Sequence, residues 1–320
     1  MPRQARLDAP GTLHHVMIRG IEKRKIVNDQ RDREDFVTRL GDIAGDTDTS
    51  IYAWALLNNH AHILLQSSDV GISQFMRRLL TGYAINYNLR HKRHGHLFQN
   101  RYKSIVCEKD TYFIELVRYI HLNPLRANLV SNLKELDSYM WCGHSVLVGK
   151  TANDWQDRDF VLKWFGKTEG EARRSYRDYV KKGIGEGRRS ELVGGGLVRS
   201  LGGWSQVKSM RRSDERELHD PRILGSGEFV DQIIKEASEK AKYQFPKNED
   251  LQEVEEYIAK MCRQEKISIT ELRSGSRRRV VAKFRGQLAI RLIEEFGISF
   301  AETARRLGVS TSAISKIVNS

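Results

Sequence analysis

Two strand-like runs that are separated by only two residues constrain the fold of this chain more than any other feature. Residues 51–57 are continuously apolar, residues 60–66 form a second strand-like run, and Asn58-Asn59 between them favours a tight turn. Strands joined this closely pair as an antiparallel hairpin. The pattern therefore predicts a chain built on an antiparallel sheet.

Further runs before and after the hairpin extend this sheet and add helices. Residues 12–19 and 103–107 are typical of short strands, whereas residues 32–43 and 71–89 have apolar residues at helical spacing. A third helix is expected from a cap at Asp110-Thr111 to about Asn123, where Pro124 ends it. Strands and helices alternate over roughly 130 residues, which predicts an α+β domain at 1–149.

The pattern changes after Gly149. Residues 151–182 and 228–265 have helical spacing, and the segment between them is rich in glycine without the lysine register of a phosphate-binding loop. We expect a helical and glycine-rich connector at 150–226 and a helical C-terminal domain at 227–320. The last part of that domain, from about residue 277, is strongly basic.

The positive charge of the chain is concentrated at two places. The formal net charge is +13, and residues 1–150 and 277–320 each contribute +6. Between Arg77 and Lys103 there are seven basic residues and no acidic residue, with four aromatic residues among them. Cations bind phosphates and aromatic rings stack on bases, so this stretch suits a nucleic acid, although a solvated basic helix has the same composition.

Other classes of protein fit the sequence poorly. Only three cysteines occur and no CxxC pair, which argues against a disulfide scaffold and a thiolate zinc site. The N-terminus lacks the apolar core of a signal peptide, and the long uncharged stretch at 51–68 contains two asparagines, two histidines and a glutamine, which a membrane span would not bury cheaply. We expect a soluble, cytoplasmic protein without a membrane partner.

His60-Ala61-His62 is the clearest candidate for a metal site. Alternate residues of a strand project from one face, so both imidazoles can reach one ion. Such pairs are more often surface or core histidines, but a second motif follows downstream. Tyr119 and Asn123 are four residues apart on a predicted helix and share a face, although a core tyrosine and a helix C-cap are the simpler interpretations.

Several other residues near these motifs have more than one interpretation. One of His14 and His15 faces inward from the first strand, and Glu108 or Asp110 could supply an extra ligand. Tyr83 fits the core, and Tyr87 fits either the core or base stacking. His121 lies on a different helical face from Tyr119.

These motifs carry a family resemblance. The HAH motif, GHLFQNRYKS at 95–104 and ELVRYIHLNPLRANLV at 115–130 resemble the one-tyrosine HUH transposases, and within them the REP-associated tyrosine transposases. The resemblance covers about residues 8–148 and implies a ferredoxin- or RRM-like nuclease fold. It implies that His60, His62 and Asn123 bind a divalent metal, Mg²⁺ or Mn²⁺, and that Tyr119 is the nucleophile.

The same resemblance implies the activity and the partner. Such an enzyme cleaves single-stranded DNA beside a palindromic repeat hairpin through a 5′-phosphotyrosine intermediate and transfers the strand. DNA-contacting residues are expected in the basic stretch, namely Arg77, Arg78, Arg90, Lys92, Arg93, His96, Arg101 and Lys103, with Gln99 beside them. We expect a monomer or a homodimer.

The C-terminal segment resembles a helix-turn-helix. Ala304 and Leu307 are expected to pack inward, Gly308 to open the turn and Ser310 to cap the second helix. Together with the preceding basic helix, it is similar to the DNA-binding domain of the replication initiator DnaA. The residues expected to face a major groove are Thr311, Ser312, Ser315 and Lys316. A three-helix bundle for protein contacts is the alternative.

Two other functions remain open from the sequence. A DNA-binding regulator could keep the nuclease fold without turnover, but the intact His60, His62, Tyr119 and Asn123 argue against it. A replication initiator or relaxase shares the histidine pair, but the short domain and single tyrosine disfavour it.

Overall fold

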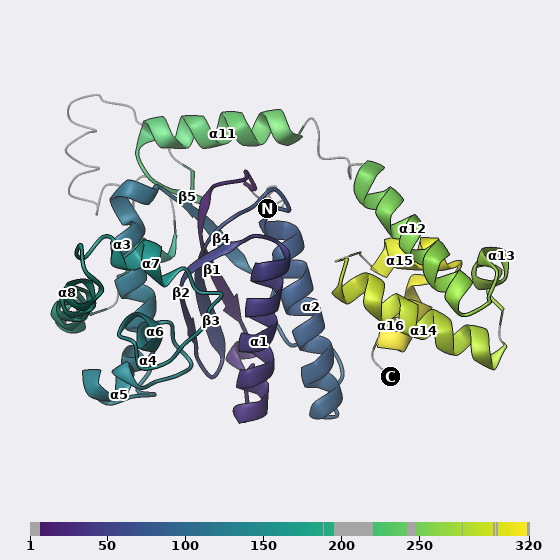
Figure 1. Cartoon of the computed structure of the whole chain (residues 1–320), viewed down its shortest axis with the longest axis horizontal. Helices are drawn as coiled ribbons and strands as arrows, with labels where there is room; N and C mark the ends of the chain where they lie inside the picture. The colour runs from purple at the N-terminus through teal and green to yellow at the C-terminus, as the bar shows by residue number, and fades with distance from the viewer. Residues whose placement is uncertain are drawn as a thin grey trace. The chain divides into compact units, whose positions relative to one another are not determined.

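The chain folds into two compact units. The computed structural model describes residues 7–187, 189–194, 220–241, 248–276, 278–296, 298 and 300–318 (Figure 1). The sheet unit comprises Met1–Ile72 and Phe98–Lys240, and the helical unit comprises Ser73–Leu97 and Ala241–Ser320. Within the described ranges, no helix is long and apolar enough to cross a membrane.

A five-stranded sheet in the order β2-β3-β1-β4-β5 forms the centre of the sheet unit. The strands are β1 (Leu13–Arg19), β2 (Ser50–Leu56), β3 (His60–Gln66), β4 (Lys103–Cys107) and β5 (Ile223–Leu224). All neighbours are antiparallel except β4 and β5, which are parallel. The predicted α+β class with an antiparallel sheet is confirmed, whereas the short β5 was not expected.

The strand alternation separates the side chains of β1 and β3 into two sets. Leu64 of β3 joins the hydrophobic core beneath α3 (Lys109–His121), and Leu13 and Met17 of β1 contribute to the same core. Because side chains on one face recur every second residue, His60 and His62 project toward this α3 face. Figure 1 shows α1 (Gln30–Asp46) on the other side of the strands.

Helix α3 is held on the sheet by an apolar stripe. Phe113, Leu116, Val117 and Ile120 are fully buried at helical spacing. The predicted cap at Asp110-Thr111 is wrong, because Glu108 occupies the N-cap position and no side chain caps the helix there. The helix also ends earlier than predicted, at His121.

Residues 123–194 add short helices that complete this core. They form α4 (Asn123–Arg126), α5 (Leu133–Asp137), α6 (His144–Leu147), α7 (Arg158–Leu162), α8 (Glu169–Lys182), η2 (Gly183–Glu186) and η3 (Ser190–Val193). Val161, Tyr176, Val180 and Leu192 are all buried in the core beneath α3. The expected connector thus contributes to the packing of the sheet unit, and α11 (Gly227–Ala241) follows β5. The ranges 1–149, 150–226 and 227–320 remain a prediction about functional domains.

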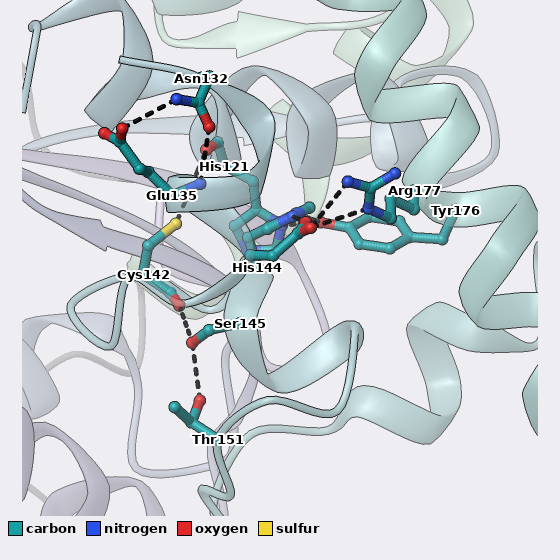
Figure 2. A network of polar contacts seen from close by, with 10 residues as sticks. His121, Asn132, Glu135, Cys142, His144, Ser145, Thr151, Tyr176 and Arg177 are labelled. Atoms are coloured by element: carbon teal, nitrogen blue, oxygen red, sulfur yellow. Dashed lines mark hydrogen bonds and ion pairs between the residues drawn. The ribbon is translucent and has the colours of Figure 1, made fainter. Parts of the chain in front are cut away.

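A buried polar network fixes the C-terminal end of α3 (Figure 2). The Tyr176 hydroxyl lies 2.7 Å from Nδ1 of His121 and 2.8 Å from Nδ1 of His144, and Nε2 of His144 lies 2.9 Å from Asp137. Asp137 accepts a further bond from Arg177 at 2.9 Å.

The directions of these hydrogen bonds follow from the acid at one end. Nε2–H of His144 donates to the Asp137 carboxylate, so Nδ1 of a neutral His144 accepts from the Tyr176 hydroxyl. The hydroxyl oxygen in turn accepts from Nδ1–H of His121. The end of α3 is therefore tied to α6 and α8.

The helical unit combines α2 with five helices from the end of the chain. Its helices are α2 (Ile72–Arg90), α12 (Asn248–Gln264), α13 (Ile269–Arg273), α14 (Arg279–Glu294), α15 (Phe300–Leu307) and α16 (Thr311–Val318). Ile85 of α2 shares a core with Ile258, Leu288 and Ile314. Nε of Arg78 also donates to the Glu294 carbonyl at 3.2 Å.

The turn between α15 and α16 depends on a glycine. Gly308 has φ +66°, and a Cβ there would lie 1.9 Å from the Arg273 carbonyl oxygen. The Ser310 hydroxyl accepts from the Ala313 amide at 3.2 Å, which confirms the predicted cap. Ala304 and Leu307 are buried as expected. A role of this helix pair as a helix-turn-helix on DNA remains a prediction.

We expect Tyr176→Phe to destabilise the sheet unit. The change leaves ring nitrogens of His121 and His144 buried without a partner, at a cost of about 1–3 kcal/mol in the free energy of unfolding. Tyr179→Phe on the same helix is the matched control, because the buried Tyr179 hydroxyl has no hydrogen-bond partner. Chemical denaturation of the two variants measures the difference, and equal losses would contradict the network.

The sheet unit should also lose stability as the pH falls below about 6.5. Burial lowers the pKa of His14 to about 4, and it lowers the pKa of His121 and His144 below their usual value of 6.5. The unfolded chain therefore binds protons that the folded chain does not. The stability that these neutral histidines contribute is fully present above their pKa in the unfolded chain, and it is lost as the pH falls below that value. Denaturation at pH 7.5, 6.5 and 5.5 tests this, and a free energy of unfolding that rises toward pH 5.5 would refute it.

Candidate functional site

A cavity of about 830 Å³ opens in the sheet unit and collects the predicted site residues. His60 and His62 reach it from β3, Tyr119 from α3 and Asn123 from the start of α4. The structure thus brings together four residues that are separated by up to 63 positions in the sequence.

The aromatic rings of the site converge. The ring centroid of His62 lies 5.3 Å from that of His60 and 5.8 Å from that of Tyr119. A third histidine, His15 of β1, lies 5.2 Å from His62 and 5.9 Å from Tyr119. His14 points away from this group, because its Nδ1 bonds to the Ser104 hydroxyl at 2.9 Å. Of the two histidines on β1, His15 is therefore the one that faces this site.

Hydrogen bonds select the same tautomer for both histidines of β3. Nδ1 of His60 lies 2.6 Å from Oδ1 of Asn59, which only accepts, so this nitrogen carries the proton. Nδ1 of His62 lies 2.9 Å from Nε2 of His15. His15 has its proton on Nδ1, which donates to the Leu192 carbonyl at 2.9 Å. His62 must therefore donate from Nδ1, and Nε2 of both His60 and His62 has a lone pair.

Burial keeps these imidazoles neutral. Burial lowers the pKa of His60 and of His15 to about 4, and it lowers the pKa of His62 well below 6.5. The positive charge of Arg19 lowers the pKa of His60 and His62 further. Neutral imidazole is the form that binds a metal ion.

Tyr119 is half-buried beside a cation. The Arg126 guanidinium lies 5.2 Å from the Tyr119 ring centroid, and its Nη1 donates to the Tyr119 carbonyl at 3.4 Å. Burial lowers the pKa of Arg126, whereas a negative charge on the Tyr119 oxygen raises it. This guanidinium is positioned to stabilise a phenolate.

Asn123 reaches the cavity by a different route from the predicted one. It begins α4 and does not continue α3, and Pro124 follows in the first turn of α4. Its Nδ2 donates to the carbonyls of Tyr119 at 3.0 Å and Ile120 at 3.3 Å. The amide nitrogen thus caps the end of α3, and Oδ1 is the atom left to bind an ion.

Among the residues that the structure describes, five cationic residues line the cavity and no Asp or Glu does. They are Arg19, Arg101, Lys103, Arg126 and Arg189. Arg101 and Lys103 belong to the predicted DNA-binding set, and Gln99 also lines the cavity. Arg189 pairs with Glu115 at 2.9 Å and with Glu186 at 3.1 Å. Nothing in the sequence near Arg189 indicated this position, because it lies in the glycine-rich segment.

The remaining predicted residues lie elsewhere. Arg77, Arg78, Arg90, Lys92, Arg93 and His96 belong to the helical unit. Arg93 lies over the Tyr87 ring at 5.7 Å, and the burial of Tyr83 and Tyr87 places both in the core. Glu108 is not part of the cavity lining and accepts from the Ser226 hydroxyl at 2.9 Å.

The C-terminal candidates lie on α16. Thr311, Ser312 and Lys316 are exposed, and Ser315 is half-buried. Contact of these residues with a DNA groove stays a prediction.

Comparison with known proteins bears on the range that holds the candidate site. Residues 11–123 match the family described as IS200-like transposases. No curated protein matches the chain. One solved structure that is similar to it is a REP-associated tyrosine transposase bound to a REP hairpin, with 15% identity and a TM-score of 0.39. That match covers 49% of this chain and 94% of the other.

The matched range runs from just before β1 to the start of α4. It contains His15, His60, His62, Tyr119 and Asn123. The match to the IS200-like transposase family thus spans the elements that carry the candidate site.

Proposed function

We propose that this protein is a metal-dependent single-strand DNA endonuclease and strand transferase with Tyr119 as its nucleophile. The observation that carries the proposal is the convergence of His60, His62, Tyr119 and Asn123 in one cavity lined by five cations. This arrangement offers ligands, a nucleophile and phosphate-binding charge within one site.

The donor atoms fit a divalent metal ion. Two imidazole nitrogens with free lone pairs and one amide oxygen make a mixed nitrogen and oxygen set, which suits Mn²⁺ and also accommodates Mg²⁺. His60, His62 and Asn123 would hold the ion. When bound, it supplies a positive charge that polarises the phosphodiester and stabilises its transition state.

The reaction of Tyr119 is a transesterification. The phenol loses its proton and its oxygen forms a bond to phosphorus, while the bond between phosphorus and the 3′ oxygen breaks. The products are a 5′-phosphotyrosine and a free 3′ hydroxyl. Attack by another 3′ hydroxyl reverses the step, so strands are exchanged without ATP. The Arg126 guanidinium, 5.2 Å from the Tyr119 ring centroid, would favour the phenolate through its positive charge.

The cations of the cavity bind the DNA strand. Arg19, Arg101 and Lys103 are exposed cationic residues of the cavity lining. A single-stranded segment presents one phosphate per nucleotide to such residues. Following the family resemblance, we propose that this segment lies beside a folded palindromic repeat.

The helical unit supplies a second DNA contact in this proposal. Thr311, Ser312 and Lys316 on α16 would contact duplex DNA, and the basic segment from Arg77 to His96 belongs to the same unit. The protein would then act on a hairpin with two surfaces, one for cleavage and one for binding.

Covalent trapping tests the nuclease. With single-stranded hairpin oligonucleotides and Mg²⁺ or Mn²⁺, we expect the protein to form an adduct that survives SDS. Tyr119→Phe should abolish the adduct, because the ring remains but the attacking oxygen is lost. Tyr112→Phe, two turns earlier on α3, is the matched control and should keep it.

The outcomes separate the candidate functions. An adduct that survives Tyr119→Phe would exclude Tyr119 as the nucleophile. Hairpin binding without any adduct would favour a DNA-binding regulator that keeps the nuclease fold. Loss of the adduct with EDTA and recovery with Mn²⁺ would support the metal requirement.

Substitution on α16 tests the second contact. Lys316→Ala should weaken binding to duplex DNA by about 3- to 10-fold and reduce its salt dependence by about one phosphate contact. Lys260→Ala is the control, since Lys260 is an exposed lysine on α12 of the same unit. Fluorescence anisotropy at several salt concentrations measures both. Equal effects of the two changes would argue against a DNA contact by α16.

A further inference from the structure

A short segment beyond the family domain reaches the candidate site. Residues 189–194 follow the matched range 11–123 by more than 60 positions. Arg189 and Val193 line the cavity, and Nζ of Lys103 donates to the Val193 carbonyl at 2.6 Å. Leu192, which is 1% exposed, anchors the segment in the core beneath α3.

This segment is connected to the metal-binding candidates through His15. The Leu192 carbonyl accepts from Nδ1–H of His15 at 2.9 Å, and Nε2 of His15 accepts from Nδ1–H of His62 at 2.9 Å. A carbonyl oxygen cannot donate, so it fixes the proton of His15 on Nδ1. The direction of the second hydrogen bond then follows from the first.

His15 has no nitrogen left for another partner. Its side chain is completely buried, and both ring nitrogens are used by Leu192 and His62. In this arrangement it cannot itself bind an ion or remove a proton from Tyr119. What it can do is hold the ring of His62 in one orientation and one tautomer.

We propose that His15 is a positioning residue for the metal site and that the Leu192 carbonyl sets its tautomer. The inference rests on the proposed function and deepens it. Residues 189–194, outside the family domain, thereby determine which nitrogen of His62 offers its lone pair to the ion. Removing such a partner of a ligand typically weakens metal binding by about 10- to 100-fold.

A difference in metal affinity between two substitutions of His15 tests this role. In His15→Gln, the side-chain oxygen can still accept from Nδ1–H of His62. In His15→Leu, an apolar side chain of similar size replaces the imidazole, so the acceptor is lost. We expect His15→Leu to weaken Mn²⁺ binding by about 10- to 100-fold and His15→Gln to stay within a few-fold of the wild type. Isothermal titration of the full chain with Mn²⁺ alone measures this.

His14→Leu is the matched control for loss of a buried histidine. His14 is equally buried but bonds to Ser104 and not to His62. It should lower stability without changing Mn²⁺ affinity. Wild-type affinity in His15→Leu, or an equal loss in His14→Leu, would overturn the positioning role.

A second measurement uses the wild-type protein, so its result does not depend on whether a variant folds. In protein labelled with ¹⁵N-histidine, NMR in the absence of metal should show His62 protonated on Nδ1 and His15 protonated on Nδ1. The opposite tautomer of either ring would contradict the proposed hydrogen bonds from His62 to His15 and from His15 to the Leu192 carbonyl.

The titration also distinguishes failure of this inference from failure of the proposed function. If His62→Ala abolishes Mn²⁺ binding while His15→Leu does not change it, the positioning role of His15 is wrong and the metal site stands. If the wild type binds no Mn²⁺, or His62→Ala binds it equally well, both the positioning role and the proposed metal site are wrong.

Discussion

The alternation of side chains along β1 and β3 is the constraint on which the site depends. In β3 it places His60, His62 and the core residue Leu64 on one face of the sheet, and in β1 it places His15 and Met17 on that face. Helix α3 packs on the same face and brings Tyr119 to the histidines. A shift of one residue in the register of β3 would turn both ligand candidates away from Tyr119.

The local sequence was sufficient to predict most elements of the sheet unit and to single out four residues that line its cavity. The hairpin and β4 follow from apolar runs and an Asn-Asn turn, which are short-range signals. By contrast, β5, Arg189 and Leu192 are brought to the sheet unit by contacts over long sequence distances. Their surroundings in the sequence are rich in glycine and suggested a connector. Such positions depend on the core that the rest of the chain provides, so a local pattern does not reveal them.

The end of α3 shows why the simple helical argument for Asn123 was incomplete. Spacing by four residues would place Tyr119 and Asn123 together only if the helix continued. Instead α3 stops at His121, and the Asn123 amide bonds back to the Tyr119 carbonyl. The hydrogen bond between His121 and the Tyr176 hydroxyl also fixes this end of α3. Polar contacts, rather than helix continuity, therefore position the candidate nucleophile Tyr119 beside the third ligand candidate.

The positive charge of the cavity and the neutrality of its histidines are physically connected. Burial is the largest cause of the low pKa values, and Arg19 lowers those of His60 and His62 further, as Lys103 does for His15. The cations that suit a phosphate thus also disfavour protonated imidazoles beside them. An acidic residue in their place would raise the pKa of the histidines and repel DNA. The cationic lining therefore favours two requirements of the proposed reaction together, an anionic strand and histidines with free lone pairs.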